Sequence, residues 1–436
     1  MEQLKRSKDL AIIYACAIVS SVVLILGWGV LENPPMSPTF INAWNNIIDG
    51  KIDVLRTPVY PCFLGIMKTL FGESDFRFAT ICVQHGIFLV SVYFYYKIAQ
   101  HLIYSKRIVF IVSFFYATFS LFTTWNNFIL TESLAISGIV ILTYIITCMR
   151  QVSVYVFVIS YTSVLFLLIF LRPALVYLLP IFILTWLYLL YSKKGRKIAF
   201  YGICGTLIVI IALLSYMKAF EKEYGIFASS RVSVVNQLCI ARQYGLLDPD
   251  VIQDSTFKSQ IIKSYQQNGE RCEDLFKDVY PEVKNWIKKY DLTILNNAIS
   301  NSINNNLKAW IVASGGRFMK SLYYPLFGVW IGYNNTYLNM VLSIFSLDIK
   351  LNLKLLYMFL FIYVIVLVFW IVKNHCFPWL SSLLYLACIG NIVVSVIGAQ
   401  DEWDRLMLPS MPLFLLLLGQ FFTMFKADPI TNIKFR

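Results

Sequence analysis

The sequence predicts an all-α integral membrane protein with about ten transmembrane helices and a large extracytoplasmic loop between the seventh and the eighth. Of its 436 residues, 58% are hydrophobic and only 14% are charged, and the mean hydropathy is +0.67. Apolar runs long enough to cross about 30 Å of hydrocarbon recur along the chain. The predicted spans are 10–31, 77–97, 108–125, 128–148, 153–171, 173–191, 198–217, 353–373, 377–398 and 405–425.

The first span follows a charged start, MEQLKRSKDL, which resembles the beginning of a signal peptide. The apolar run after it is long enough to cross a bilayer, and no cleavage site with small residues follows. We therefore expect an uncleaved first helix.

The positions of the basic residues predict the orientation. If the spans alternate, every basic cluster in a short connection falls on one side, which the positive-inside rule assigns to the cytoplasm. We expect a multi-pass protein of a cell (inner) membrane with both termini cytoplasmic. This use of Lys and Arg accounts for the net charge of +13, so no nucleic-acid partner is expected. The clusters are Lys5, Arg6 and Lys8; Lys97, Lys106 and Arg107; Lys193, Lys194, Arg196 and Lys197; Lys373; and Lys426, Lys434 and Arg436.

Three regions are predicted along the chain. Residues 1–217 form an N-terminal transmembrane module with a first extracytoplasmic loop at 32–57, residues 218–350 form the large loop or subdomain, and residues 351–436 form the C-terminal helices. The aromatic segment 310–333 is consistent with a span or with an interfacial position. In the large loop, Cys239 and Cys272 are able to pair. The cysteines show no ligand spacing, so no metal site is predicted.

The first loop carries three carboxylates, Glu32, Asp49 and Asp53. Each is a candidate general base toward a hydroxyl, or an ordinary solvated loop acid. Arg56 precedes TPVYP, where the prolines stiffen the chain; a helix with proline in its first turn is the plain structural interpretation. Tyr60 of that motif is a candidate substrate contact.

Charged residues at the predicted ends of spans are costly, and so they are functional candidates. Glu132 lies just inside the fourth span, and Arg172 lies between two spans in LRP. Arg172 is suited either to bind a phosphate or to anchor at lipid headgroups. In QDEWDRLMLP, Asp404 and Arg405 indicate either a site with an anion-binding group and a base, or an internal ion pair.

The sequence lacks the motifs of several classes of enzyme. The sequence contains no Walker loop, GxSxG or HExxH, and no DxD pair in a segment predicted to be cytoplasmic. The three histidines are too far apart in the predicted topology to form one site. Any reaction would therefore take its energy from an activated substrate, which at the extracytoplasmic face means a lipid-linked group.

Four motifs together resemble the GT-C class of membrane glycosyltransferases, and in particular bacterial relatives of protein O-mannosyltransferase and lipid A aminoarabinose transferase. They are the first loop ending in RTPVYP, TES in the fourth span, LRP after the fifth, and DRLMLPSMP at the start of the last. The resemblance covers most of the chain and implies inverting transfer of a sugar from a polyprenyl-phosphate donor to a hydroxyl of a lipid, glycan or protein acceptor. It implies no cofactor, although a divalent metal stays open.

The resemblance also assigns roles to residues. Such a transfer needs cations that hold the leaving phosphate, for which we expect Arg56, Arg172 and Arg405, and a carboxylate that takes the acceptor proton. Many members carry that acid about four positions before the aromatic residue of the first loop, where this chain has Met36. The base is then displaced to Asp49, Asp53 or Glu32.

Other functions fit parts of the pattern. A polymerase of polysaccharide repeat units would share the outward loops and arginines. A transporter or flippase of lipid-linked saccharides would need charged or broken helices at the midplane, whereas the charges here are predicted at one edge. A noncatalytic membrane scaffold would account for Met36.

Overall fold

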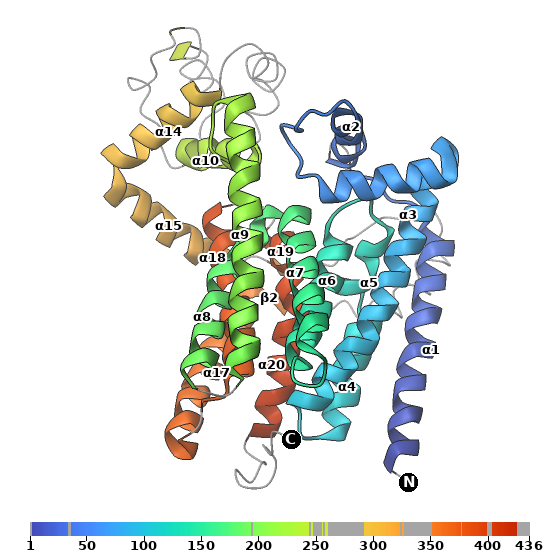
Figure 1. Cartoon of the computed structure of the whole chain (residues 1–436). Helices are drawn as coiled ribbons and strands as arrows, with labels where there is room; N and C mark the ends of the chain where they lie inside the picture. Colours follow the sequence, from blue (N-terminus) through green and yellow to red (C-terminus); the bar gives the residue numbers. More distant parts are fainter. Residues whose placement is uncertain are drawn as a thin grey trace.

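The computed structural model describes residues 2–33, 36–192, 195–243, 246, 255, 258–259, 292–322, 325–326, 351–375, 377–398 and 403–424. Long helices run side by side, with the N-terminus and the end of α20 at one end of the bundle (Figure 1). The opposite end carries α2, α10 and α14, and we call it the loop end.

The first half of the chain contains α1 (Glu2–Trp28), α2 (Met36–Ile48), α3 (Val59–Leu102), α4 (Lys106–Thr118), α5 (Ser120–Thr123), η1 (Thr124–Asn127), α6 (Glu132–Thr147), α7 (Val154–Leu171), η2 (Pro173–Tyr177), α8 (Leu178–Tyr191) and α9 (Arg196–Tyr224). The second half contains α10 (Val232–Gln243), α14 (Leu292–Asn305), α15 (Leu307–Ser321), α17 (Leu353–Asn374), α18 (Trp379–Gly398), α19 (Trp403–Met407), η4 (Leu408–Ser410) and α20 (Met411–Met424). Two short strands, β1 (Pro325–Leu326) and β2 (Leu351–Asn352), pair antiparallel.

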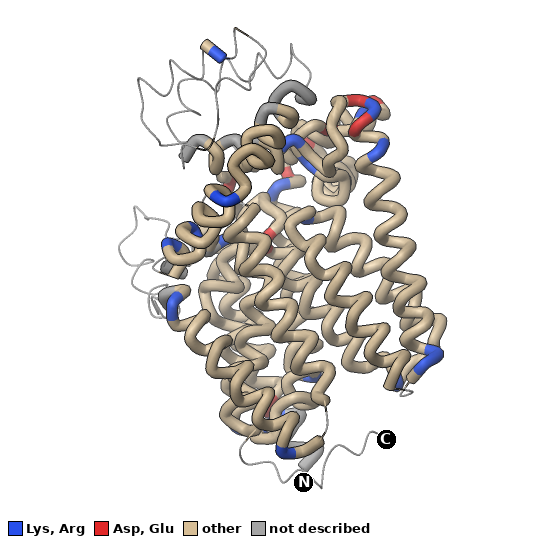
Figure 2. Tube along the Cα trace, turned by 90° about the vertical axis from the view of Figure 1, so that its left-hand side faces the viewer, with Lys and Arg blue, Asp and Glu red and all other residues tan. Residues whose placement is uncertain are grey.

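The helices have the length and composition of membrane spans. Eight of those described are long and apolar enough to cross a bilayer, and the pair made by α4 with α5 and η1, bent by 48°, would be a ninth. The shorter apolar α6 coincides with the remaining predicted span. Charged residues gather at the two ends of the bundle, and the helices between them are almost free of charge (Figure 2). The chain is therefore an all-α, multi-pass membrane protein, as predicted, while the number of spans and the extent of the large loop stay predictions.

The large loop is described in part. α10, α14 and α15 belong to it, and Cys239 of α10 is in a disulfide bond. The predicted partner, Cys272, lies outside the described residues, as does much of 310–333 beyond α15.

Helix α3 is too long for one crossing, and it consists of two arms. Its 44 residues would extend about 66 Å if straight. The helix bends at Gly72, whose φ of 77° and ψ of 174° are not helical and are disfavoured for residues with a side chain. The first arm, 59–71, crosses the loop end of the bundle, and the second descends through it (Figure 1). RTPVYP therefore starts an arm that lies along the loop end, with Pro58 as the N-cap.

Helix α2 packs on the first arm of α3 at a glycine. A Cβ added to Gly65 would lie 2.1 Å from the Trp44 ring, and the ring of Phe40 meets that of Tyr60 edge-on with centroids 5.0 Å apart. This contact fixes the height of α2 above the bundle, and with it the position of the first turn of α2.

We expect Gly65→Ala to loosen α2, because the indole ring must move away from the new methyl group. Such overpacking typically costs about 1–3 kcal/mol, measurable as a lower midpoint of thermal unfolding and faster proteolysis within 36–57. Gly86→Ala is the matched control, since nothing lies within 4 Å of a Cβ at that position of the same helix. Equal effects of the two changes would contradict the packing described.

Candidate functional site

Glu132 is a buried carboxylate at the loop end of the bundle. It is the first residue of α6 and is 2% exposed. A helix N-terminus favours a negative charge, which explains why the chain tolerates an acid there. Glu132 begins the apolar helix α6, which is shorter than the candidate spans, so its place at the end of a span stays a prediction.

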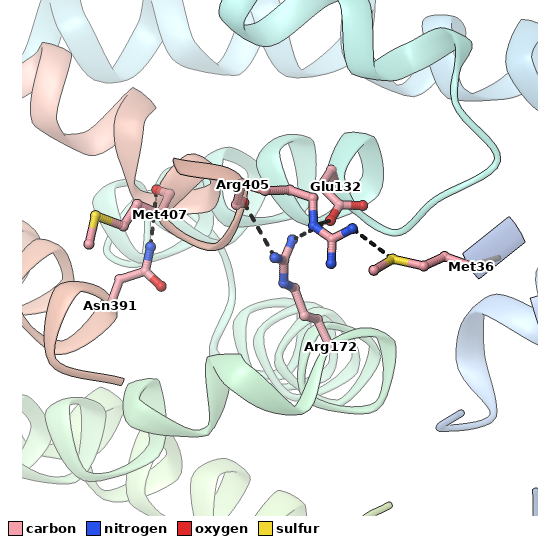
Figure 3. Close-up of polar contacts among 6 residues, drawn as sticks. All are labelled: Met36, Glu132, Arg172, Asn391, Arg405 and Met407. Atoms are coloured by element: carbon pink, nitrogen blue, oxygen red, sulfur yellow. Dashed lines mark hydrogen bonds and ion pairs between the residues drawn. The ribbon is translucent and has the colours of Figure 1, made fainter. Parts of the chain in front are cut away.

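Two arginines from distant parts of the chain contact one oxygen of this carboxylate. Oε1 of Glu132 lies 3.3 Å from Nη1 of Arg172 and 3.2 Å from Nε of Arg405. Arg172 also donates from Nη2 to the carbonyl oxygen of Arg405, at 3.3 Å (Figure 3). The structure thus brings together three of the residues selected from sequence, which α6, the α7–η2 junction and α19 supply.

Local sequence explains both arginine positions. Arg172 precedes Pro173, and a residue before proline is disfavoured in the helical conformation; α7 ends there, with Arg172 at φ −146°. Arg405 lies in the short helix α19, just before Pro409 of η4. The Asn391 amide of α18 donates to the Met407 carbonyl at 3.1 Å, which holds α19 in place (Figure 3).

The first turn of α2 connects this cluster to Arg56. Met36 Sδ lies 2.8 Å from Nη1 of Arg405. Thr39 and Phe40 share the Met36 face of the helix; Nε of Arg56 donates to Thr39 Oγ1 at 2.8 Å, and its guanidinium lies 3.9 Å from the Phe40 ring centroid. Contacts therefore run continuously from Arg56 through α2 to Arg405 and Glu132.

Asp53 organises the loop that precedes Arg56. Its Oδ1 accepts from the backbone N–H groups of Leu55 and Arg56, at 2.8 and 2.7 Å, and Oδ2 accepts from Asn46 at 2.7 Å. A hydrogen bond from the Tyr224 hydroxyl of α9 to the Ile52 carbonyl, 2.6 Å long, anchors the same loop. Both Asp53 oxygens thus serve to shape the turn that presents Arg56.

The two other predicted bases have contacts elsewhere. Glu32 is ion-paired with Arg77 at 2.6 Å. The Asp49 side chain is 62% exposed and lies 3.9 Å from Lys51. Asp404 belongs to α19, but its side chain is outside the described residues.

A second buried network joins Tyr60 to the start of α6, and sequence reasoning missed it. The Tyr60 hydroxyl donates to Gln84 Oε1 at 3.0 Å, and Gln84 Nε2 donates to the carbonyl oxygens of Asn126 and Phe128, both at 2.9 Å. Asn126 Oδ1 accepts from Ser133, the neighbour of Glu132, at 2.5 Å. The available signals were a glutamine within a predicted span and the polar segment TTWNN, Thr123 to Asn127, the last four residues of which form the buried helix η1.

The cluster contains two arginine side chains and one carboxylate oxygen, Oε2 of Glu132, that can accept a hydrogen bond. Among the residues that the structure describes, Oε2 of Glu132 is buried and has no hydrogen-bond partner. Two guanidinium groups suit a phosphate, and a carboxylate oxygen suits a hydroxyl proton. No group of three His, Cys, Asp or Glu side chains that could hold a metal ion occurs in the described part of the chain.

Comparison with known proteins provides no assignment: no family model matches the chain, and no curated protein matches it.

We expect Glu132→Gln to destabilise the fold, because it leaves two buried arginines without their shared carboxylate. Breaking a buried ion pair from one side typically costs about 3–5 kcal/mol, measurable by denaturant unfolding in detergent. The matched control is Glu221→Gln, which removes an exposed pair with Lys218 and should cost no more than about 1 kcal/mol. A Glu132→Gln protein as stable as the control would contradict the ion-pair arrangement.

Proposed function

We propose that the chain is a membrane glycosyltransferase that moves a sugar, with inversion, from a polyprenyl-phosphate donor to an acceptor hydroxyl at the loop end of the bundle. The proposal places this end at the extracytoplasmic face of a cell (inner) membrane, with the termini in the cytoplasm. The acceptor class, whether lipid, glycan or protein, is left open.

One observation carries the proposal most: Glu132, Arg172 and Arg405 meet in a buried cluster at the end of an apolar bundle. Buried charges in a membrane protein are expensive and usually functional. Their position at the end of the bundle fits a substrate with an anionic head and an apolar tail. The arginines suit the anionic head, and the apolar bundle suits the tail. The four motifs that resemble the GT-C class include all three residues.

In the proposed reaction, the acceptor oxygen attacks the anomeric carbon as the bond from that carbon to the phosphate oxygen breaks. The acceptor proton passes to a carboxylate, and polyprenyl phosphate leaves as an anion. Arg172 and Arg405 stabilise the charge that develops on the leaving phosphate, and Arg56 contributes from its position against Thr39 and Phe40 of α2. No acid is required, since a phosphate is a good leaving group.

The contacts favour Glu132 as the base over the three loop acids proposed from sequence. Both oxygens of Asp53 accept hydrogen bonds that shape the turn. Glu32 is ion-paired with Arg77, and Asp49 is exposed. Glu132 combines burial with an oxygen that accepts no hydrogen bond from the described residues. Its other oxygen stays with the arginines, so base and phosphate-binding groups are held together.

The rival functions predict different products. A repeat-unit polymerase would transfer oligosaccharides and leave a monosaccharide donor intact, and a flippase would change the distribution of labelled lipid across a vesicle without breaking it. A noncatalytic scaffold would do neither.

The test uses purified full-length protein in nanodiscs with radiolabelled polyprenyl-phosphate hexoses and pentoses. We expect label to appear in water-soluble or acceptor-bound form, and Arg172→Ala or Arg405→Ala to lower the rate by about 10²–10³, the usual effect of removing one charge-stabilising donor. Arg77→Ala is the matched control, because Arg77 pairs with Glu32 outside the cluster. The proposal fails if the wild-type protein turns over none of these donors while it redistributes them across vesicles.

A second experiment locates the base. We expect Glu132→Gln to lower the transfer rate by about 10²–10⁴, the range for a general base, and Asp49→Asn to leave it unchanged. Asp53→Asn should lower the rate less than about tenfold, because an amide oxygen still accepts the turn's backbone hydrogen bonds. An Asp53→Asn rate as low as that of Glu132→Gln would instead assign the base to Asp53.

A further inference from the structure

Two consecutive helices of the large loop present opposite surfaces to their surroundings. α14 exposes polar side chains, among them Asn297, Asn301 and Asn304, and buries Ile299. This is the ordinary pattern of a helix in water. α15 begins two residues after α14 ends, and from there the pattern reverses.

The exposed surface of α15 is apolar apart from Lys308 and Lys320. Its members are Leu307, Ile311, Val312, Phe318 and Met319, of which Val312 is 68% exposed. The face turned to the protein instead carries Arg317, 1% exposed, and Ser321, fully buried. A helix that buries an arginine and exposes five large apolar side chains is matched to an apolar environment rather than to water.

The position of α15 identifies that environment. The helix descends from α14 toward the loop end of α18 (Figure 1). Its end meets α17, where the Phe318 and Tyr357 rings stack with centroids 5.2 Å apart and Ser321 bonds the Tyr357 hydroxyl at 2.9 Å. The apolar surface of α15 is thus continuous with the exposed apolar surfaces of two spans, which include Leu355, Met358 and Phe361 of α17 and Ile397 of α18.

We propose that α15 lies in the membrane, within the leaflet at the loop end, with its apolar face against lipid and the boundary with water near Asn306. Exposed lysines at both ends, Lys308 and Lys320, can extend to the headgroups, as lysines flanking an interfacial helix do. At 15 residues the helix is about 22 Å long, too short to span. The large loop is then a membrane-anchored segment, in place of the soluble subdomain considered from sequence.

This placement brings a further cation beside the cluster. The Arg317 guanidinium lies 5.9 Å from the Trp403 ring centroid, and Trp403 begins the short helix that contains Arg405. α15 therefore connects the lipid phase physically to α19. The membrane contact of α15 does not depend on which reaction the protein performs.

The test uses the unmodified full-length protein in nanodiscs that contain a lipid with a photoactivatable diazirine in its acyl chain. Trypsin cleavage after Lys289, Lys308 and Arg317 gives peptide 309–317, which lies within α15, and peptide 290–308, which holds α14 and the first two residues of α15. We expect lipid adducts mainly on 309–317, with any on 290–308 confined to Leu307 and Lys308, and the reverse preference with a water-soluble carbene reagent. Aqueous labelling of 309–317 without lipid adducts would overturn the proposal, as would protection of 309–317 from both reagents, which would mean that protein covers it.

A pair of variants provides a second measurement. Val312→Asp places a charge on the apolar face and should abolish lipid adducts on 309–317, because an acid is expelled from hydrocarbon. Asn304→Asp adds the same charge to the polar face of α14 and should leave the adducts unchanged. Equal lipid labelling of 309–317 in both variants would contradict the assigned orientation.

Discussion

The contact of Glu132 with two arginines is the constraint on which the loop end of the bundle depends. Charges buried at the end of apolar helices must be neutralised by other charges, and here the three side chains come from residues 132, 172 and 405 of the chain. The start of α6, the break after α7 and the short helix α19 must therefore converge on one point. Asn391 fixes α19 from the opposite side, so this point is held by four segments.

The first loop is arranged around the same point. Met36 places the first turn of α2 against Arg405, and Asp53 shapes the turn that leads Arg56 back to α2. Tyr60, which packs on Phe40 of α2, and Gln84 connect the first arm of α3 to the residue beside Glu132. Displacement of α2 would thus be transmitted to both arginine positions and to the proposed base.

Sequence reasoning identified the residues of the cluster, but it did not predict the contacts between them. Glu132, Arg172 and Arg405 were recognisable because charges at the edges of apolar runs are costly, and the helices themselves were recognisable by length and hydropathy. That both arginines meet one oxygen of Glu132 depends on tertiary packing across more than 200 residues, which no local pattern specifies. Asp53 had the same appearance as a catalytic acid, since a turn-forming carboxylate and a base are both loop acids in sequence.

Other features were hidden for separate physical reasons. The bend at Gly72 follows from one positive φ angle inside a run that otherwise favours helix. Asn126 and Asn127 of TTWNN fall between two predicted spans, but they satisfy buried polar groups of neighbouring segments. The apolar outer face of α15 was masked because the exposed lysines at its ends and its buried Arg317 lower the hydropathy of the segment below that of a span.

Met36 gives the cluster its particular character. At the position where the resemblance leads us to expect an acid, a thioether contacts Arg405, so Glu132 is the only carboxylate that contacts the two arginines in the described part of the chain. An acid at position 36 would compete with Glu132 for Arg405. We therefore propose that Glu132 of α6 serves both as the counter-ion of the arginines and as the base.

In the proposed reaction, this buried pair of arginines recognises a lipid-borne phosphate. Native mass spectrometry of the protein released from nanodiscs doped with equal amounts of polyprenyl phosphate and polyprenol measures that recognition. We expect polyprenyl phosphate to be retained and polyprenol not, and Arg172→Met with Arg405→Met to remove this preference while leaving bulk lipid adducts unchanged. Equal retention of the two lipids by the wild-type protein, or an undiminished preference in the double variant, would contradict it.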